Sequence, residues 1–137
     1  MDTHNPKEKI LIVDDEPMAR TLLRLMLVRS GYEVIEAVDG YDALEKLRTI
    51  LPDLVVLDVM MPGLNGFDVC STIRDEKATS RIPVIMLSAK TDTASVSQGM
   101  DVGATRYLTK PVSPDELTRQ VSDILADFSN PFQSAVG

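Results

Sequence analysis

The stretch KILIVDDEP (residues 9–17) joins an unbroken apolar run to adjacent acids and a proline. Apolar residues that do not alternate with polar ones are typical of a strand buried on both faces of a parallel sheet. Proline is favoured in the first turn of a helix, so Pro17 predicts that a helix begins directly after the acids. The stretch therefore predicts a strand followed by a helix, which is the unit that α/β folds repeat.

The same alternation continues along the chain. The apolar runs LVVL (54–57) and VIML (84–87) predict two more central strands, and the weaker segments 33–38 and 106–109 predict edge strands. Right-handed crossovers between five strands and five helices give a doubly wound α/β fold. We therefore expect a five-stranded parallel sheet in the order 2-1-3-4-5 between two layers of helices.

Capping residues and apolar spacing locate the helices. Asp39, Asn65, Asp92 and Ser113 can each cap a helix start, and Gly31 and Gly103 can end the first and the fourth helix. Apolar residues at three- and four-residue spacing predict the stripe that each helix buries. In the first helix these are Ala19, Leu22, Leu23, Met26 and Leu27, and in the fifth they are Leu117, Val121, Ile124 and Phe128.

Composition limits the class of protein. No apolar run approaches the ~20 residues of a transmembrane helix and residues 1–9 are polar, so we expect a cytoplasmic chain without membrane insertion. The net charge of −7 predicts no direct binding of nucleic acid, whose phosphates repel an acidic surface. We expect one domain over residues 9–128, an N-terminal tail over 1–8, and a C-terminal tail or truncated linker over 129–137.

Polar side chains stand after four of the five predicted strands, where open parallel sheets bind their ligands. They are Asp14, Asp15 and Glu16 after the first strand, Asp58 after the third, Ser88 after the fourth and Lys110 after the fifth. Taken singly, each has a structural explanation: a helix cap for Asp15, a turn for Asp58, a backbone contact for Ser88 and a solvated surface position for Lys110. Taken together they indicate a functional site, because the first and third strands are neighbours in the predicted sheet.

The residue types of this pocket indicate phosphoryl chemistry with a divalent cation. Clustered carboxylates repel one another unless a cation lies between them. The ligands are all oxygen atoms, which favours Mg²⁺ over zinc or copper. Aspartate is a competent nucleophile toward phosphorus, and a lysine and a hydroxyl are suited to phosphoryl oxygens.

Four stretches have an order and spacing that carry further information: ILIVDDEP (10–17), LVVLDVMMPGLNG (54–66), PVIMLSA (83–89) and GATRYLTKP (103–111). Together they resemble the receiver domains of response regulators in two-component signalling, including the chemotaxis regulators, from about Lys9 to Phe128. The resemblance implies a flavodoxin-like three-layer sandwich. It also implies a signalling switch that catalyses only its own phosphotransfer and autodephosphorylation, not an enzyme with an external substrate.

The resemblance assigns the chemistry of the pocket to individual residues. Asp58 would be the phosphoacceptor and a Mg²⁺ ligand. Asp15 would be a direct Mg²⁺ ligand, the main-chain carbonyl of Met60 another, and Asp14 would act through water. Lys110 would contact the phosphoryl group.

It also implies how the state of the pocket is controlled and transmitted. Ser88 and Tyr107 would form the switch, the Lys110–Pro111 peptide bond would be cis, and the small Ala89 would leave access to the phosphoryl group. Met60 and Lys90 stand where family members control the approach of the hydrolytic water.

The implied partners are a histidine kinase or histidine phosphotransfer protein as donor, and a downstream output protein or covalently linked output domain. Transcription-factor receivers that dimerise through their fourth and fifth helices often carry acids before the switching aromatic. This chain has Thr105 and Arg106 there, so we do not expect that dimer.

Two other interpretations compete with this one. A degenerate receiver would bind partners without phosphorylation, but Asp15, Asp58, Ser88 and Lys110 are all present. A phosphatase of the haloacid dehalogenase type also uses an aspartyl nucleophile. That family places it after the first strand in an Asp-x-Asp pattern, whereas Asp14 and Asp15 are adjacent.

Overall fold

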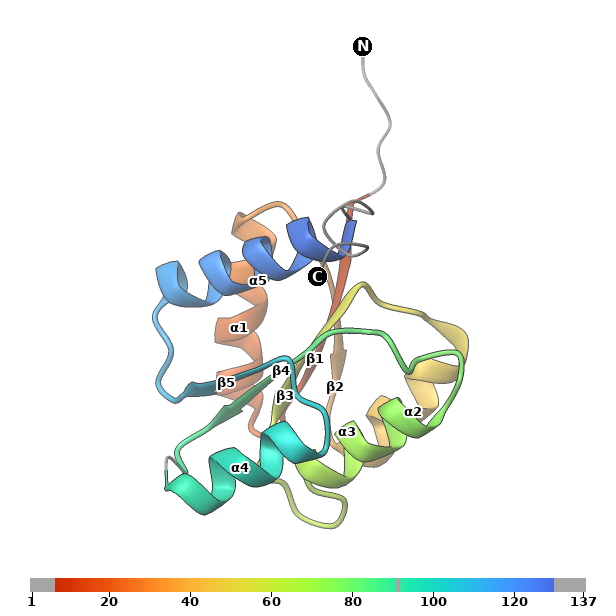
Figure 1. Cartoon of the computed structure of the whole chain (residues 1–137). Coiled ribbons are helices and arrows are strands. Elements are labelled where there is room, and N and C mark those ends of the chain that lie inside the picture. Colours follow the sequence, from red (N-terminus) through yellow and green to blue (C-terminus); the bar gives the residue numbers. More distant parts are fainter. Residues whose placement is uncertain (1–6, 91, 130–137) are drawn as a thin grey trace.

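Strands and helices alternate along the chain in the computed structural model, which describes residues 7–90 and 92–129 (Figure 1). The strands are β1 (Lys9–Val13), β2 (Glu33–Ala37), β3 (Leu54–Asp58), β4 (Val84–Ser88) and β5 (Arg106–Thr109). The helices are α1 (Pro17–Arg29), α2 (Gly40–Thr49), α3 (Gly66–Asp75), α4 (Thr93–Asp101) and α5 (Pro114–Ser129).

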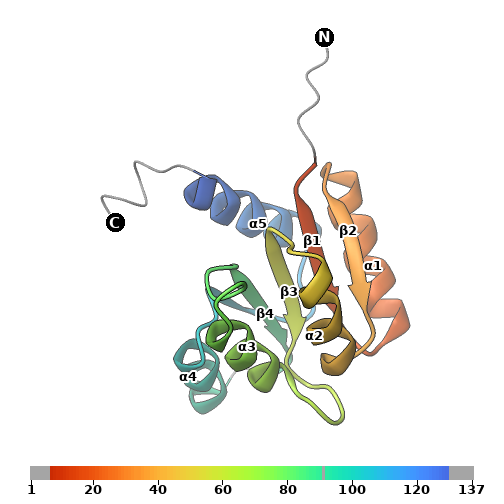
Figure 2. The same cartoon turned by 90° about the vertical axis from the view of Figure 1, so that its right-hand side faces the viewer.

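The five strands are parallel and lie in the order β2-β1-β3-β4-β5, which confirms the predicted sheet. Figure 2 shows β2, β1, β3 and β4 side by side across the sheet. Val13, the last residue of β1, pairs with Ala37 of β2 and with Leu57 of β3. The residues that follow β1 therefore lie next to the carboxyl ends of both neighbouring strands.

Two apolar cores hold the layers together, one on each face of the sheet. In β1, Ile10 and Ile12 belong to the core that includes Leu23 and Leu27 of α1. The alternate residues of β1 belong to the other core, with side chains of α2 and α3. This alternation explains why the central strands are apolar without interruption, since both of their faces are buried.

Most helix starts are capped as the sequence predicts. Asp39, Asn65, Asp92 and Ser113 each accept a hydrogen bond from the main-chain N–H three residues further on. In α1 the capping residue is Glu16, whose Oε1 accepts from the N–H of Ala19 at 2.7 Å. The capping role considered for Asp15 is therefore wrong, which leaves its carboxylate available for other contacts.

The structure differs from the sequence prediction in a few places. Strands β3 and β4 each include one more residue, Asp58 and Ser88, and β2 ends at Ala37. Leu22 was expected in the buried stripe of α1 but is 56% exposed, because only part of this helix face is covered. The side chain of Phe128 lies outside the described residues. Among the residues that are described, no helix is long and apolar enough to cross a membrane.

Candidate functional site

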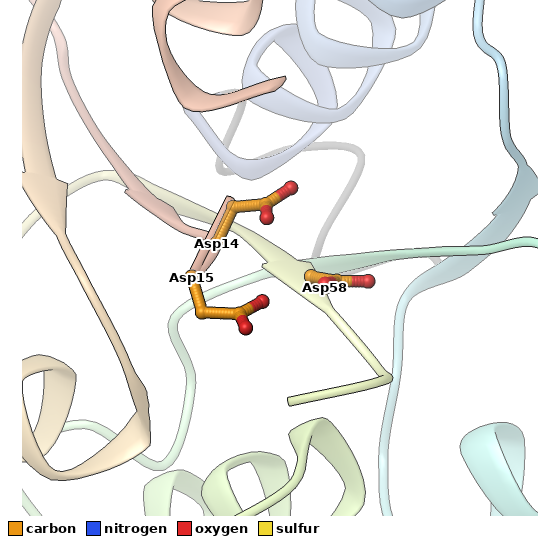
Figure 3. A group of neighbouring side chains, drawn as sticks. All are labelled: Asp14, Asp15 and Asp58. Carbon is orange, nitrogen blue, oxygen red and sulfur yellow. The ribbon is translucent and has the colours of Figure 1, made fainter. Parts of the chain in front are cut away.

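Three carboxylates meet where β1 and β3 end. Asp14 and Asp15 directly follow β1, and Asp58 is the last residue of β3. One carboxylate oxygen of each lies within 4.8 Å of the others, and Figure 3 shows the three side chains turned the same way. Asp14 and Asp58 are buried whereas Asp15 is exposed, so the cluster reaches from the interior to the surface.

Asp14 is held by contacts on every side. Its Oδ1 accepts from the N–H of Glu16 at 2.9 Å, and its Oδ2 accepts from Lys110 Nζ at 2.9 Å. Its own N–H donates to the carbonyl of Ala37 at 3.2 Å, and its carbonyl accepts from Arg20 Nη1 at 2.9 Å. Asp14 is therefore completely buried and held in place, and its contacts connect β1 with β2, α1 and the end of β5.

Lys110 supplies the positive charge of the pocket. Its Nζ lies 2.9 Å from Asp14 Oδ2 and 3.4 Å from Asp58 Oδ1. Burial by itself lowers the pKa of Lys110, but the hydrogen bond to Asp14 and the charge of Asp58 outweigh burial and raise it above its usual value. Lys110 is consequently a permanent cation that can reach an anionic group bound to Asp58.

The folded chain disfavours the ionised form of Asp58. Burial raises the pKa of Asp58, and the charge of Asp14 adds to that effect. The charge of Lys110 lowers the pKa without cancelling the increase, so the pKa lies above the ordinary value of an aspartate. A further cation would stabilise the ionised form, since nearby positive charge favours a carboxylate.

Ser88 and Tyr107 both contact Lys90, which lies between β4 and α4. Ser88 is completely buried, and its Oγ accepts from the N–H of Lys90 at 2.9 Å. Tyr107 Oη donates to the carbonyl of Lys90 at 2.7 Å. A Cβ atom at Gly99 of α4 would come within 2.8 Å of the Tyr107 ring, so the ring lies directly against that helix. The two predicted switch residues are thus linked through a single residue.

The remaining predicted residues surround the mouth of the pocket. Met60 is 54% exposed, and its N–H donates to Asp58 Oδ1 at 3.4 Å. Ala89 is exposed and lines, with Lys110 and Pro111, a cavity of about 360 Å³ that reaches α1. The Lys110–Pro111 peptide bond is cis.

Sequence reasoning did not identify Arg20 or its partner Glu36. Arg20 Nε lies 3.0 Å from Glu36 Oε1, in addition to the contact with the carbonyl of Asp14. A signal was available in β2, because Glu36 interrupts an otherwise apolar segment near the end of that strand. An acid at such a position indicates a cationic partner on a neighbouring element.

The arrangement can bind a hard divalent cation and transfer a group to Asp58. The carboxylate oxygens of Asp14, Asp15 and Asp58 are the ligands that such a cation prefers. Lys110, whose ammonium contacts both Asp14 and Asp58, can neutralise charge on an incoming phosphoryl group.

The sequence matches known proteins over most of its length. Residues 10–122 match the family described as the response regulator receiver domain. The chain is 48% identical over 118 residues to the alkaline phosphatase synthesis transcriptional regulatory protein PhoP of Bacillus subtilis, covering 86% of this chain and 48% of PhoP. It is 44% identical over 121 residues to the DNA-binding response regulator MtrA of Mycolicibacterium smegmatis, covering 88% of this chain and 51% of MtrA. The chain spans about half the length of these curated relatives.

Solved structures show the same fold. The chemotaxis protein CheY4 of Vibrio cholerae superposes with a TM-score of 0.83 at 33% identity, covering 87% of this chain and 99% of CheY4. The receiver domain of the Francisella response regulator 1452 superposes with a TM-score of 0.81 at 34% identity, covering 90% of this chain and 99% of that domain.

Proposed function

This chain belongs to the response regulator receiver domain family, and on that premise we propose that Asp58 accepts a phosphoryl group from a histidine kinase or a histidine phosphotransfer protein. Receivers are signalling switches and not enzymes that turn over an external substrate, and the haloacid dehalogenase interpretation is set aside. The observation that carries the proposal is that the buried Asp58 lies close to two further acids and to the ammonium of Lys110.

The residues present fit Mg²⁺. Among the described residues, the candidate ligands that gather here are three carboxylates, which suit a hard cation. Asp15 and Asp58 would bind the ion directly with the main-chain carbonyl of Met60, and Asp14 would act through water. When bound, Mg²⁺ would neutralise charge on the carboxylates and on the phosphoryl oxygens.

The transfer step requires little more than positioning. A carboxylate oxygen of Asp58 attacks the phosphorus atom, an O–P bond forms, and the P–N bond to the donor histidine breaks. The electron pair of that bond returns to the imidazole, which is protonated from solvent. Lys110 moves its ammonium from Asp14 and Asp58 to the new phosphoryl oxygens, a short displacement because it already lies 3.4 Å from Asp58.

Autodephosphorylation reverses the modification. Water attacks the phosphorus atom, inorganic phosphate leaves, and the carboxylate of Asp58 is restored. The long side chain of Met60 is exposed two residues after the end of β3, and in this proposal it hinders the approach of that water. This placement supports a role for Met60 in the lifetime of the phosphorylated form.

Ser88 and Tyr107 transmit the change. A phosphoryl oxygen on Asp58 offers a strong acceptor to the hydroxyl of Ser88, which ends the neighbouring strand. Movement of Ser88 displaces Lys90, which both side chains contact, and Tyr107 rotates inward. The surface formed by α4, β5 and α5 then changes where a partner can read it.

The donor protein requires a surface beside the pocket, and α1 provides one. Met18, Leu22, Leu25 and Val28 are apolar residues of this helix that are 46–76% exposed. Leu22 and Leu25 line a groove of about 680 Å³ between α1 and α5, and α1 begins two residues after Asp15. Exposed apolar patches of this kind mark protein interaction sites. The α1 face is therefore the docking surface for the phosphohistidine protein in this proposal.

The output is a downstream protein or a covalently linked output domain. PhoP and MtrA are described as transcriptional and DNA-binding regulators, and each is about twice as long as the segment that matches this chain. The place of action in this proposal is the cytoplasm, where two-component donors present their phosphohistidine.

Incubation with acetyl phosphate, with and without Mg²⁺, tests the proposal without knowledge of the kinase. Intact-mass measurement should show one added phosphoryl group that depends on Mg²⁺. An unmodified wild-type chain under both conditions would favour the alternative of a degenerate receiver that binds partners without phosphorylation.

A further inference from the structure

Arg20, in α1, joins the ends of two strands. Its Nη1 donates to the carbonyl oxygen of Asp14 at 2.9 Å, and its Nε lies 3.0 Å from Oε1 of Glu36 in β2. The Arg20 side chain is only 16% exposed, so the guanidinium is held between the helix and the sheet. The carbonyl that it contacts belongs to the peptide unit between Asp14 and Asp15.

We propose that Arg20 is a positioning residue for the divalent cation, because it fixes the peptide unit from which Asp15 projects. This inference rests on the proposed function, in which Asp15 is a direct ligand of Mg²⁺. Holding the carbonyl of Asp14 restricts the main-chain rotation that would turn the side chain of Asp15 away from Asp58.

Asp15 depends on this contact more than Asp14 does. The carboxylate of Asp14 has its own partners, the N–H of Glu16 and the ammonium of Lys110. Within residues 7–90 and 92–129, no hydrogen bond or ion pair to a protein group holds the carboxylate of Asp15. The direction of Asp15 is therefore set by its main chain, which Arg20 constrains.

The anchor of Arg20 is itself rigid. Arg24 Nε lies 3.0 Å from Oε2 of Glu36, so both carboxylate oxygens of Glu36 are paired with α1. Lys46 of α2 donates from Nζ to the main-chain carbonyl of Glu36 at 2.7 Å. Glu36 thus gives Arg20 a fixed second attachment point.

Arg24 provides a matched control. It stands one helical turn after Arg20, carries the same charge and pairs with the same glutamate. The contact that distinguishes the two arginines is the hydrogen bond from Arg20 to the carbonyl of Asp14.

A simple charge effect and a positioning role predict opposite changes in Mg²⁺ affinity when Arg20 is removed. Removal of a positive charge beside a cation site reduces repulsion, which by itself would tighten Mg²⁺ binding. Loss of the constraint on Asp15 weakens binding. The direction of the change therefore separates a positioning role from a simple charge effect.

The test titrates Mg²⁺ alone into the full chain and follows backbone amide shifts around residues 14–16 and 58–60. For Arg20→Gln we expect the dissociation constant for Mg²⁺ to rise about tenfold, the lower end of the range for residues that hold a metal ligand in place. For Arg24→Gln we expect this constant to stay within about twofold of the wild-type value. At saturating Mg²⁺, the rate at which acetyl phosphate labels Arg20→Gln should recover to that of the wild type. Unchanged or tighter binding by Arg20→Gln, or equal weakening in both variants, would overturn the proposal.

Arg20→Lys keeps the positive charge, so it tests the proposal even if Arg20→Gln does not fold. The ammonium of lysine is a compact charge and lacks the planar fork that contacts Asp14 and Glu36 together, so we expect weakened Mg²⁺ binding here as well. Full wild-type affinity in Arg20→Lys would contradict a geometric role. A wild-type chain that binds no Mg²⁺ would refute the proposed function, whereas a normal wild type with an unaffected Arg20→Gln would refute this inference alone.

Discussion

Replacement of Lys110 by methionine should destabilise the chain in the absence of Mg²⁺. The change keeps an unbranched side chain but removes the cation that lies 2.9 Å from Asp14 and 3.4 Å from Asp58. Two buried carboxylates would then face each other without compensation. Breaking a buried ion pair on one side costs about 3–5 kcal/mol, and Lys110 is 27% exposed, so we expect a loss of about 2–3 kcal/mol in the free energy of unfolding.

The pH dependence of that loss follows from Asp58. Its pKa is raised in the folded chain, mainly by burial, and removal of Lys110 removes an effect that lowers it. Because the pKa of Asp58 is raised in the folded chain, its electrostatic penalty on stability is absent below the unfolded pKa, which is about 3.9 for aspartate. The penalty appears as the pH rises through the folded pKa. The difference between Lys110→Met and wild type should therefore be largest near neutral pH and shrink toward pH 4.

Urea unfolding between pH 4 and pH 8, with and without Mg²⁺, measures both effects. Mg²⁺ at one hundred times its dissociation constant should restore about 2.7 kcal/mol, because the ion binds the folded state. Lys77→Met, at an exposed position between α3 and β4, is the control for the loss of a lysine. A loss in Lys110→Met that does not vary with pH would show that packing of the lysine stem, and not charge, explains the effect.

Substitutions at three further positions test individual roles. Asp15→Ala should weaken Mg²⁺ binding strongly while the metal-free chain stays as stable or becomes more stable, because carboxylate repulsion is relieved; an unchanged affinity in a Mg²⁺ titration would remove Asp15 from the ligand set. Met60→Glu and Met60→Asn should change the rate of dephosphorylation, and rates within about twofold of wild type, near 0.4 kcal/mol, would refute a role for the side chain. Ser88→Ala should still accept a phosphoryl group but lose the distal response to beryllofluoride; amide shifts around Tyr107 as large as in wild type would show that the hydroxyl does not couple the two regions.

The fold could be predicted from the sequence because burial on both faces leaves a clear pattern. Strands β1 and β3 each contain four consecutive apolar residues, ILIV and LVVL, which is typical of strands that are buried on both faces. The predicted strand ends indicate where the carboxylates lie, because right-handed crossovers limit the order of the strands in the sheet. Lys110 and Asp14 are 96 positions apart, yet both were assigned to one pocket by this reasoning alone.

Other features depend on packing that no local pattern encodes. Leu22 has the spacing of a buried residue, but α5 covers only part of α1 and leaves it exposed. Arg20 looks like an ordinary helix residue, and its contact with Asp14 depends on where α1 packs relative to the end of β1. Glu16 and Asp15 are both acids before Pro17, and only the structure shows that Glu16 is the cap.

The most direct test of the account is to locate the phosphoryl group after incubation with acetyl phosphate and Mg²⁺. Reduction by borohydride converts an aspartyl phosphate to homoserine, which peptide mass spectrometry assigns to a position. The account predicts homoserine at position 58 in the wild-type chain and no labelling of Asp58→Asn, which lacks the attacking carboxylate but retains its shape. Stoichiometric labelling of Asp58→Asn, or homoserine at position 14 or 15 of the wild type, would contradict it.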